Sequence, residues 1–448
     1  MSTMHQINMA VGDGGAVHMP PKEAVYSDLL SLGVSARKSH VEFAAQAGGD
    51  YKPGSRNVME IPISVGDGQW VDFSNHYIKM KIANNTTAVN GDARGSMYFT
   101  AHDFVQRLQI LGTNSELLED VTDYNKIARL LQMHQLDRDD EEVQHQLGGF
   151  KPLGSEPFNA ANPVNAIIGQ TVTFQLISGV LNCSKYFPLG MARNRSLTIR
   201  IELAPAITAI CSTNVGGTAT GIATDKPDYS ISEVSLGCDV ISMSDSYNMK
   251  FRSMLEQMGS INIHYTTYKG YQNVISGTGG TIIVPDSSRS LKSIFTCFLN
   301  APAVHTDSLL LINPNITSYI YNVNSHSYPS SNVTVAGADR TNADKALWTA
   351  ANTSTAFALL HTALGGVSSS KTLVNDYDNA ATKGFAIGVC TESFNRSSNV
   401  LESGENLSQS SNPIRLVLTT GVDCTSHSFT LSDRLISFDA SGSLTSSG

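Results

Sequence analysis

Apolar and polar residues alternate in a series of short segments, and this period of two constrains the fold more than any other feature. In 59–64 the apolar positions are Met59, Ile61 and Ile63, and their neighbours are mostly polar. Because successive side chains of a strand point to opposite faces, this pattern is typical of antiparallel strands with one buried face. The same alternation, or a weaker form of it, recurs at 76–83, 171–181, 196–204 and 229–243.

A second series of strand-like segments follows the first over a similar length. Strand and helix patterns do not alternate regularly, which favours sandwiches or barrels over a parallel sheet. The sequence therefore predicts an all-β fold of two tandem eight-stranded jelly-roll β-sandwiches with a few inserted helices. The segments of the second series are 261–268, 281–284, 290–300, 307–313, 385–390, 413–420 and 427–439.

The predicted domains follow from these two series. Helical patterns are expected at 121–133, where Thr122 or Asp123 can cap the start, and at 353–366. The boundaries that we predict are an N-terminal arm at 1–56, a first jelly roll at 57–243, a helical linker at 244–257, and a second jelly roll at 258–448 with a long surface-loop insertion at about 300–385.

Composition limits the classes of partner. Only 15% of the 448 residues are charged, against about 25% in a typical soluble protein. A surface with few charges is often covered by partners, although a Ser/Thr-rich monomer is an alternative. The net charge is −9, and residues 1–60 hold five basic and six acidic residues. Because nucleic-acid binders usually carry a basic patch, direct nucleic-acid binding is not expected.

Candidate motifs for catalysis and metal binding do not match their required spacing. An EF-hand loop beginning at Asp137 would need glycine at its sixth position and glutamate at its twelfth, where Glu142 and Gly148 stand. A solvated face is the simpler interpretation of this acidic run, and a weak cation site at a subunit contact stays open. The histidines, including His134 and His145, lack HExxH spacing and are expected at the surface. The glycine-rich segment 276–281 fits a hairpin turn better than a dinucleotide site. The sequence predicts no catalytic residues, no cofactor and no metal ligands.

Cysteine usage and the N-terminal sequence bear on the compartment. The six cysteines form no CxxC pair, so buried reduced thiols are expected. The first residues lack a basic segment followed by an apolar core, so no secretory signal is expected. No window approaches about 18 consecutive apolar residues. The N-x-S/T triplets are treated as chance occurrences in a Ser/Thr-rich chain.

Four stretches resemble major capsid proteins of the double jelly-roll lineage, which includes those of adenoviruses, tectiviruses, virophages, Polinton-like viruses and large DNA viruses. In 58–82 a short aspartate–aromatic segment precedes a lysine-bearing strand, and in 101–131 an acidic dipeptide precedes a helix that begins with Tyr-Asn. The stretches 181–206 and 412–444 are similar to a turn with its paired strand and to the closing strands of the second jelly roll. Residues 300–385 match no part of the family that we can name.

The resemblance implies a major capsid protein whose homotrimers are pseudo-hexagonal, because three chains supply six sandwiches, and tile an icosahedral virion shell. Implied partners are other copies of the chain, minor capsid proteins and penton proteins, with an internal membrane left open. The implied location is the virion, after synthesis in the host cytoplasm or nucleus. The family has no catalytic residues to carry over. Deletion of the 1–56 arm is expected to spare the trimer and impair shell assembly.

Two other classes of function remain as alternatives. A viral spike, fibre or lectin-like adhesin built on a β-sandwich would be expected to show clustered surface aromatics. Aromatic residues make up 7% of the chain and Trp70 and Trp348 are its two tryptophans, so no aromatic platform is evident. A β-sandwich hydrolase would need an acid pair or a triad, and none stands out.

Overall fold

A computed structural model of the chain divides it into a unit of residues 1–36 and a unit of residues 37–448. The sheets and helices described below lie in the second unit, apart from Ala36 at the start of the first described strand. The residues that the structure describes are 35–46, 48–85, 94–96, 100–135, 147, 170–183, 185–209, 211–213, 228–277, 279–300, 311–314, 316–335, 351–365, 385–393, 403–408, 412–420 and 423–447.

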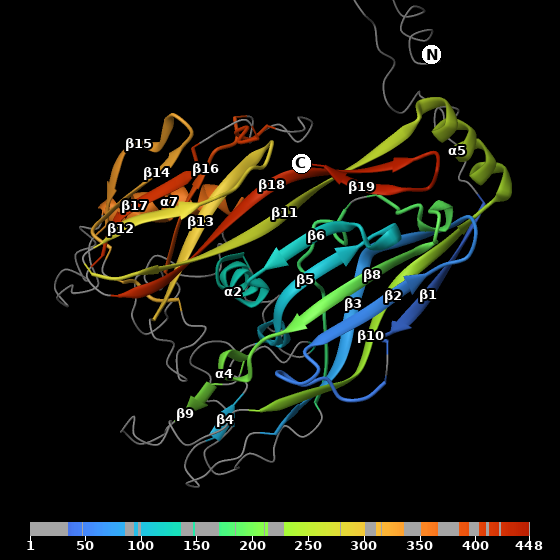
Figure 1. Ribbon diagram of the computed structural model, residues 1–448, viewed down its shortest axis with the longest axis horizontal. Helices are drawn as coiled ribbons and strands as arrows, with labels where there is room; N and C mark the ends of the chain where they lie inside the picture. The colour runs from blue at the N-terminus through green and yellow to red at the C-terminus, as the bar shows by residue number, and fades with distance from the viewer. Residues whose placement is uncertain are drawn as a thin grey trace, which may run out of the picture. The chain divides into compact units, whose positions relative to one another are not determined.

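Eight strands of the first half form a sandwich of two antiparallel four-stranded sheets, ordered β1-β10-β3-β7 and β2-β8-β5-β6 (Figure 1). A separate two-stranded ribbon pairs β4 (Arg94–Ser96) with β9 (Cys211–Thr213). The eight strands are β1 (Ala36–Ala44), β2 (Val58–Ser64), β3 (Gln69–Asn84), β5 (Val105–Leu111), β6 (Leu117–Thr122), β7 (Gln170–Phe174), β8 (Ser196–Leu203) and β10 (Tyr229–Met243).

The core of this sandwich contains the apolar residues that the alternation singled out. Met59, Ile61 and Ile63 of β2 are fully buried, while their neighbours in the strand are half-buried or exposed. The apolar positions of β3 between 78 and 82 and those of β8 are buried in the same way. Each such side chain contributes roughly 1.5–3 kcal/mol by leaving water. The predicted strands at 59–64, 76–83 and 196–204 are confirmed.

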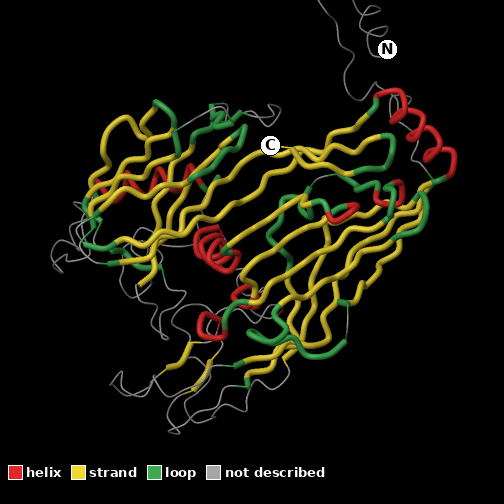
Figure 2. Tube along the Cα trace, viewed as in Figure 1, coloured by secondary structure: helices red, strands yellow, loops and turns green. Residues whose placement is uncertain are grey.

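The second sandwich repeats this strand order, with sheets β11-β18-β13-β16 and β12-β17-β14-β15. Figure 2 shows the strands of both sandwiches in yellow. A further strand, β19, extends β18. The prediction of two eight-stranded sandwiches is confirmed. The strands are β11 (Ser260–Ile275), β12 (Gly280–Val284), β13 (Leu291–Asn300), β14 (Ser318–Val323), β15 (His326–Thr334), β16 (Ala386–Cys390), β17 (Ile414–Thr419), β18 (Cys424–Asp439) and β19 (Leu444–Ser447).

Helix α5 (Asp245–Met258) lies between the two sandwiches in sequence, where a helical linker was predicted. It ends at Gly259, whose φ of 77° suits the left-handed turn that commonly terminates helices. Trp70 anchors it, because the indole ring meets Phe251 edge-on at 4.7 Å and the indole N–H donates to Asn248 at 3.1 Å. No helix in the described ranges is long and apolar enough to cross a membrane.

The other helices are α2 (Tyr124–Gln135), α7 (Ala351–Ala363) and the short α4 (Ala206–Ala209). Helix α2 starts three residues later than the predicted 121–133, because Val121 is a core residue of strand β6. Helix α7 overlaps the helical pattern predicted at 353–366. The predicted strand at 171–181 ends at Phe174, and the residues after it form turns. Three 3-10 turns complete the described part: η3 (Ala101–Phe104), η4 (Thr113–Ser115) and η6 (Leu189–Met191).

The predicted arm at 1–56 is too long. Strand β1 is the edge strand of the sheet β1-β10-β3-β7, and Tyr51 is only 3% exposed in the core of the first sandwich. Without β1, that sheet would have three strands and the first jelly roll seven. Residues 37–56 therefore belong to the first sandwich, while residues 1–34 lie outside the described part of the chain.

The predicted insertion at about 300–385 is also too broad. Strands β14 and β15 fall inside this range, and both belong to the sheet β12-β17-β14-β15. Tyr319, Tyr321 and Val323 alternate along β14 with their side chains in the core. Part of the segment that was taken for a surface loop is therefore structural sheet.

Candidate functional site at the junction of the two sandwiches

The two sandwiches meet along two edge strands, β6 of the first and β11 of the second. The Thr267 hydroxyl donates to Glu119 Oε1 at 2.9 Å, and the Thr122 hydroxyl donates to the Gly270 carbonyl at 3.0 Å. The Tyr265 hydroxyl donates to the carbonyl of Leu118. These contacts advance along both strands in the same direction, so β6 and β11 lie side by side with parallel chain direction.

Glu119 is the centre of this junction. Its fully buried carboxylate accepts hydrogen bonds from the Gly179 N–H at 2.8 Å, the Val180 N–H at 3.2 Å, the Thr267 hydroxyl and the Ser178 hydroxyl. Burial raises the pKa of Glu119, and the four hydrogen bonds oppose that rise. A buried carboxylate is costly unless its oxygens are satisfied, and these donors satisfy them. Glu119 thereby links β6, the 178–180 turn and β11.

Gly179 sets how closely the two sandwiches approach. A Cβ atom on this residue would lie 1.8 Å from the carbonyl oxygen of Thr266 and 2.9 Å from the ring of Tyr265. The distance of 1.8 Å is far shorter than any non-bonded contact between heavy atoms, and the Thr266 oxygen cannot turn aside because it belongs to the backbone. Only glycine allows the turn to touch β11 in this way.

A second link joins the start of α2 to strand β18. The Asp123 carboxylate accepts from Lys126 Nζ, from Gln106 Nε2 at 3.1 Å and from His427 Nδ1 at 3.1 Å. Burial would raise the pKa of Asp123, but the hydrogen bond from His427 and the charge of Lys126 outweigh it and lower that pKa. Burial lowers the pKa of His427, so a neutral ring donates to the carboxylate. The helix-capping role predicted for Asp123 falls to its carbonyl oxygen, which accepts from the N–H groups of Lys126 and Ile127.

Helix α2 is buried on nearly every side. The polar residues of this helix are buried as well as its apolar ones, so it lacks the solvent-facing side of an ordinary amphipathic helix. At its end Gln135 Nε2 donates to the carbonyl of Leu364 in the second half of the chain at 2.7 Å. His134 is 1% exposed, so the expected surface position is wrong for this residue; His76, His102 and His427 are buried too. The buried polar residues of α2 are Asn125, Lys126, Arg129, Gln132 and His134.

His102 and Asp103 are neighbouring buried groups with opposite electrostatic responses. Burial lowers the pKa of His102 to about 3, so its ring is neutral. Burial raises the pKa of Asp103 to about 6, against the opposing charge of Arg129. The Tyr124 hydroxyl accepts from the Ile177 N–H and lies 2.9 Å from His102 Nδ1, which fits a hydroxyl that donates to the neutral ring.

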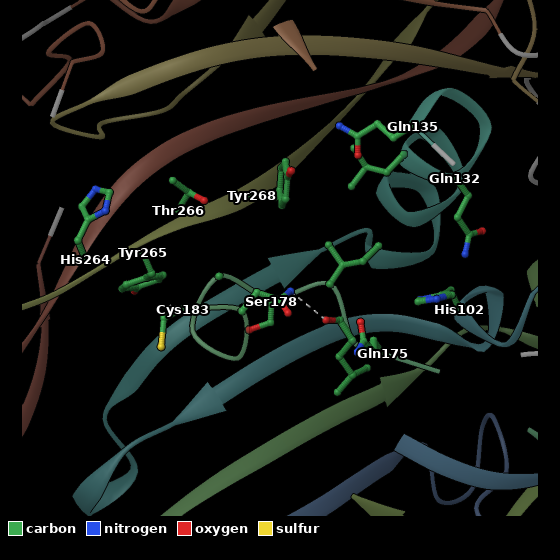
Figure 3. Close-up of a pocket in the computed structure, with 15 residues that line it drawn as sticks. His102, Gln132, Gln135, Gln175, Ser178, Cys183, His264, Tyr265, Thr266 and Tyr268 are labelled. Carbon is green, nitrogen blue, oxygen red and sulfur yellow. Dashed lines mark hydrogen bonds between the residues drawn. The ribbon is translucent and has the colours of Figure 1, made fainter. Parts of the chain in front are cut away.

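A cavity of about 560 Å³ lies at this junction, and side chains of both sandwiches line it (Figure 3). Gln132 and Gln175 come from the first sandwich, and His264 and Tyr265 come from β11. Burial raises the pKa of Cys183, whose thiol donates to a backbone carbonyl at 3.5 Å, so it is held as a thiol and not as a nucleophilic thiolate. The described lining contains no carboxylate that could act as a general base.

The other residues and segments singled out from the sequence form no catalytic or metal-binding cluster in the described part of the chain. The acidic run at 137–142 and His145 lie outside the described residues. The segment 276–281 connects β11 to β12, and Gly277 and Gly279 have φ values of 83° and 125°, as a tight connection requires. Within the described ranges no three His, Cys, Asp or Glu side chains are grouped as a metal site would need. Cys183, Cys238, Cys297 and Cys424 are buried and unpaired, as the sequence predicted.

Comparisons with known proteins bear on the architecture. No protein-family model matches the chain, and neither does any curated protein sequence. Solved structures do match. A chain of the Sputnik virophage is 10% identical with a TM-score of 0.60, and the match covers 97% of this chain and 94% of that one. A chain of the PBCV-1 virus capsid is 12% identical with a TM-score of 0.57, and the match covers 93% of this chain and 99% of that one. The Faustovirus major capsid protein is 8% identical with a TM-score of 0.52, and the match covers 93% of this chain and 92% of that one.

The chain has the double jelly-roll fold. The matches extend over both sandwiches, so the likeness is to the tandem arrangement and not to one jelly roll alone. In this double jelly roll the contacts of Glu119, Gly179 and Asp123 lie between the two rolls. The resemblance includes Glu119 as half of the acidic dipeptide before the helix, but it gave no signal that Glu119, Gly179 or Asp123 lies at a junction, because their partners are distant in sequence. The only local sign is that Glu119 shares a strand face with the buried Val121.

Proposed function

We propose that this chain is a major capsid protein whose homotrimers, pseudo-hexagonal in outline, tile an icosahedral virion shell. One observation carries the proposal: the double jelly-roll fold extends over at least 93% of the chain, and the Faustovirus major capsid protein and a chain of the PBCV-1 capsid match it over nearly their whole length. The extended likeness to capsid chains supports a structural role.

The geometry of the junction supports the same role. A shell needs building blocks of fixed shape, and the buried contacts of Glu119 and Asp123 hold the two sandwiches of one chain in a fixed relation. Three chains with two similar sandwiches each supply six sandwiches, which is the number that a nearly hexagonal block requires. A rigid pair is a better unit for such a ring than two sandwiches on a flexible linker.

The proposal includes partners and location. Other copies of the chain are the first partners, followed by minor capsid and penton proteins in the virion. We propose no enzymatic activity and no cofactor. The pKa values of His102 and Cys183 fit this proposal, because a ring with a pKa of about 3 is a weak base and a thiol with a raised pKa is a poor nucleophile.

Sedimentation velocity and negative-stain microscopy of the purified full chain test the proposal. We expect a species of 144 kDa, three times the chain mass of 48.0 kDa, that resists dilution and shows hexagonal outlines, with shells forming at higher concentration. A chain that sediments only as a monomer at micromolar concentration would overturn it. Binding to a glycan array without self-assembly would favour the adhesin alternative instead.

A further inference from the structure

A lysine and two acidic residues meet at three neighbouring strands of the second sandwich. Lys292 lies near the start of β13, which stands between β18 and β16 in its sheet. Asp433 belongs to β18, and Glu392 follows the end of β16. Lys292 Nζ lies 3.2 Å from Glu392 Oε1 and 3.6 Å from Asp433 Oδ1. One amine is therefore within reach of two carboxyl groups.

A bulge in β13 sets the position of Lys292. The pairing of β13 with β18 shifts between Leu291 and Ser293, so Lys292 has no opposite residue in the register of the two strands. Bulges of this kind redirect a side chain and are common beside functional sites. The N–H of Thr391 donates to the Lys292 carbonyl at 2.8 Å, which holds the end of β16, and with it Glu392, beside the lysine.

Asp433 is the more buried of the two acids. Its side chain is 2% exposed, against 16% for Glu392. Oδ2 of Asp433 accepts from the Ser290 hydroxyl at 2.8 Å. Oδ1 is buried and makes no hydrogen bond of normal geometry within the described part of the chain, although His264 Nε2 lies 3.1 Å from it. Because a buried ion pair needs excellent geometry to offset its desolvation, the ionic form of Lys292 and Asp433 is poorly stabilised.

We propose that Lys292 and Asp433 condense into an amide bond that links β13 to β18 covalently. The amide removes two opposite charges from a buried place, and the folded strands hold the two groups close together, as a fast intramolecular reaction requires. Reacting atoms about 3–3.5 Å apart are in position to react, and Nζ can reach this distance from Cγ by a small movement of its flexible stem. The reaction occurs once in each chain, so it is a modification and not an enzymatic activity.

The step needs no co-reactant. Glu392 takes a proton from the Lys292 ammonium and passes it to Oδ1, which leaves a neutral amine beside a neutral Asp433 acid. The amine attacks Cγ, and the Ser290 hydroxyl donates to Oδ2, where negative charge develops. Glu392 then carries a second proton from Nζ to Oδ1, the bond between Cγ and Oδ1 breaks, and water leaves. The ammonium and the carboxylate become one amide and one water, and Glu392 ends as it began.

The bond closes a long covalent loop in the second sandwich. Strands β14, β15, β16 and β17 and helix α7 lie between the two linked residues in sequence. Closing such a loop lowers the entropy of the unfolded chain, so the second sandwich resists unfolding more strongly than hydrogen bonds alone would allow.

The mass of the purified full chain tests the inference. Under denaturing and reducing conditions we expect a mass lower than that of the sequence by about 18 Da, one water molecule. A tryptic digest should contain a branched peptide that joins Lys292 to Asp433. The digest is needed because a succinimide at Asp67–Gly68 would also remove one water. An unchanged mass, or a loss that maps elsewhere, overturns the inference and leaves the proposed function untouched.

Two variants and a control identify the reacting groups. Lys292→Arg keeps the positive charge but offers no amine that readily loses a proton, and Glu392→Gln keeps the shape but cannot carry protons. Each should have the full mass of its own sequence. Lys269→Arg is the control, since Lys269 Nζ lies 3.5 Å from the buried Asp286 in the same sandwich, and it should keep the loss. A loss that persists in Lys292→Arg overturns the inference, and the wild-type mass decides it even where a variant fails to fold.

Discussion

Two residues at the junction act by opposite means. Glu119 contributes a carboxylate that gathers four donors from two neighbouring segments. Gly179 contributes the absence of a side chain, which lets the turn touch the backbone of Thr266. Hydrogen bonds to a charged group contribute on the order of 1.5–3 kcal/mol each, so the contact depends on both the donors and their close approach.

Gly179→Ala tests the close approach. The added methyl would lie 1.8 Å from the Thr266 carbonyl oxygen, so the turn or β11 must move and the Glu119 hydrogen bonds must lengthen. We expect the free energy of unfolding to fall by about 3 kcal/mol or more. Urea unfolding followed by tryptophan fluorescence measures the loss.

Gly280→Ala is the matched control for this substitution. Gly280 lies in an exposed part of the second sandwich, at the start of β12, and no atom would come within 4 Å of its Cβ. We expect a change of less than about 1 kcal/mol. Equal losses in the two variants would contradict the role assigned to Gly179.

The neighbours His102 and Asp103 have opposing pH dependences. Folding raises the pKa of Asp103 to about 6, so between pH 4 and 6 the folded protein holds a proton there that the unfolded chain releases, and this contribution to stability falls as pH rises. Folding lowers the pKa of His102 to about 3, so its contribution falls as pH drops. In the wild type the two contributions largely cancel over this range.

Asp103→Asn removes one side of that balance and keeps an oxygen that can accept from the Thr100 N–H. On acidification from pH 6 to 4 we expect the variant to lose about 2 kcal/mol more of its unfolding free energy than the wild type does. His102→Gln should behave in the opposite way and gain stability relative to the wild type. Urea titrations at both pH values measure the difference, and parallel acid responses in all three proteins would contradict the assigned pKa values.

At this scale, the sequence predicted the core but not the junction. Residues such as Met59 and Ile61 stand in a local alternation, and that alternation alone places them inside. Glu119 finds its partners 59 and 148 residues further along the chain. No local pattern encodes such a pairing, so the sequence marked this acid only as half of an acidic dipeptide before a helix and by its place on the face of Val121.

At the scale of elements, predictability depended on how each strand is buried. Strands with one face in the core, such as β2 and β8, alternate clearly and were predicted. Strand β1 has no buried residue, so its sequence shows no clear alternation of apolar and polar residues apart from the half-buried Val41 and Phe43. Strand β14 carries Ile320 between two tyrosines, which blurred its alternation. Both strands were therefore missed.

Truncation tests the status of β1. A chain that begins at residue 35 keeps β1, and we expect it to match the full chain in solubility and thermal midpoint. A chain that begins at residue 45 lacks β1 and leaves a side of β10 unpaired, so we expect a midpoint lower by several degrees or insoluble protein. This replaces the expectation that deletion of all of 1–56 would spare the trimer and impair only shell assembly. Equal midpoints for the two truncations would mean that β1 is dispensable.

At the scale of the whole molecule, charge should separate trimer formation from shell formation. Three copies of −9 give a trimer of −27, and neighbouring trimers on a facet repel one another. Salt shortens the screening length from about 10 Å at 0.1 M to about 3 Å at 1 M. We expect shell yield by light scattering to rise with sodium chloride while the trimer fraction in sedimentation stays constant. A trimer that dissociates over the same salt range would mean that charge interactions weakened by salt also hold the three chains together.

The place of β1 in its sheet also has a consequence for how the chain is made. Ser39 bonds to Val240, a residue 201 positions later, so at about 5–20 residues per second the ribosome needs roughly 10–40 s to supply the partner strand. Until β10 has been made, β1 has no partner strand and its backbone groups are open to pairing with other proteins. Its run of Arg37, Lys38, His40 and Glu42 resists unwanted pairing. Among the described strands β1 is synthesised first, yet it can join its sheet only after β10 has been made, and its charged residues protect the nascent chain until then.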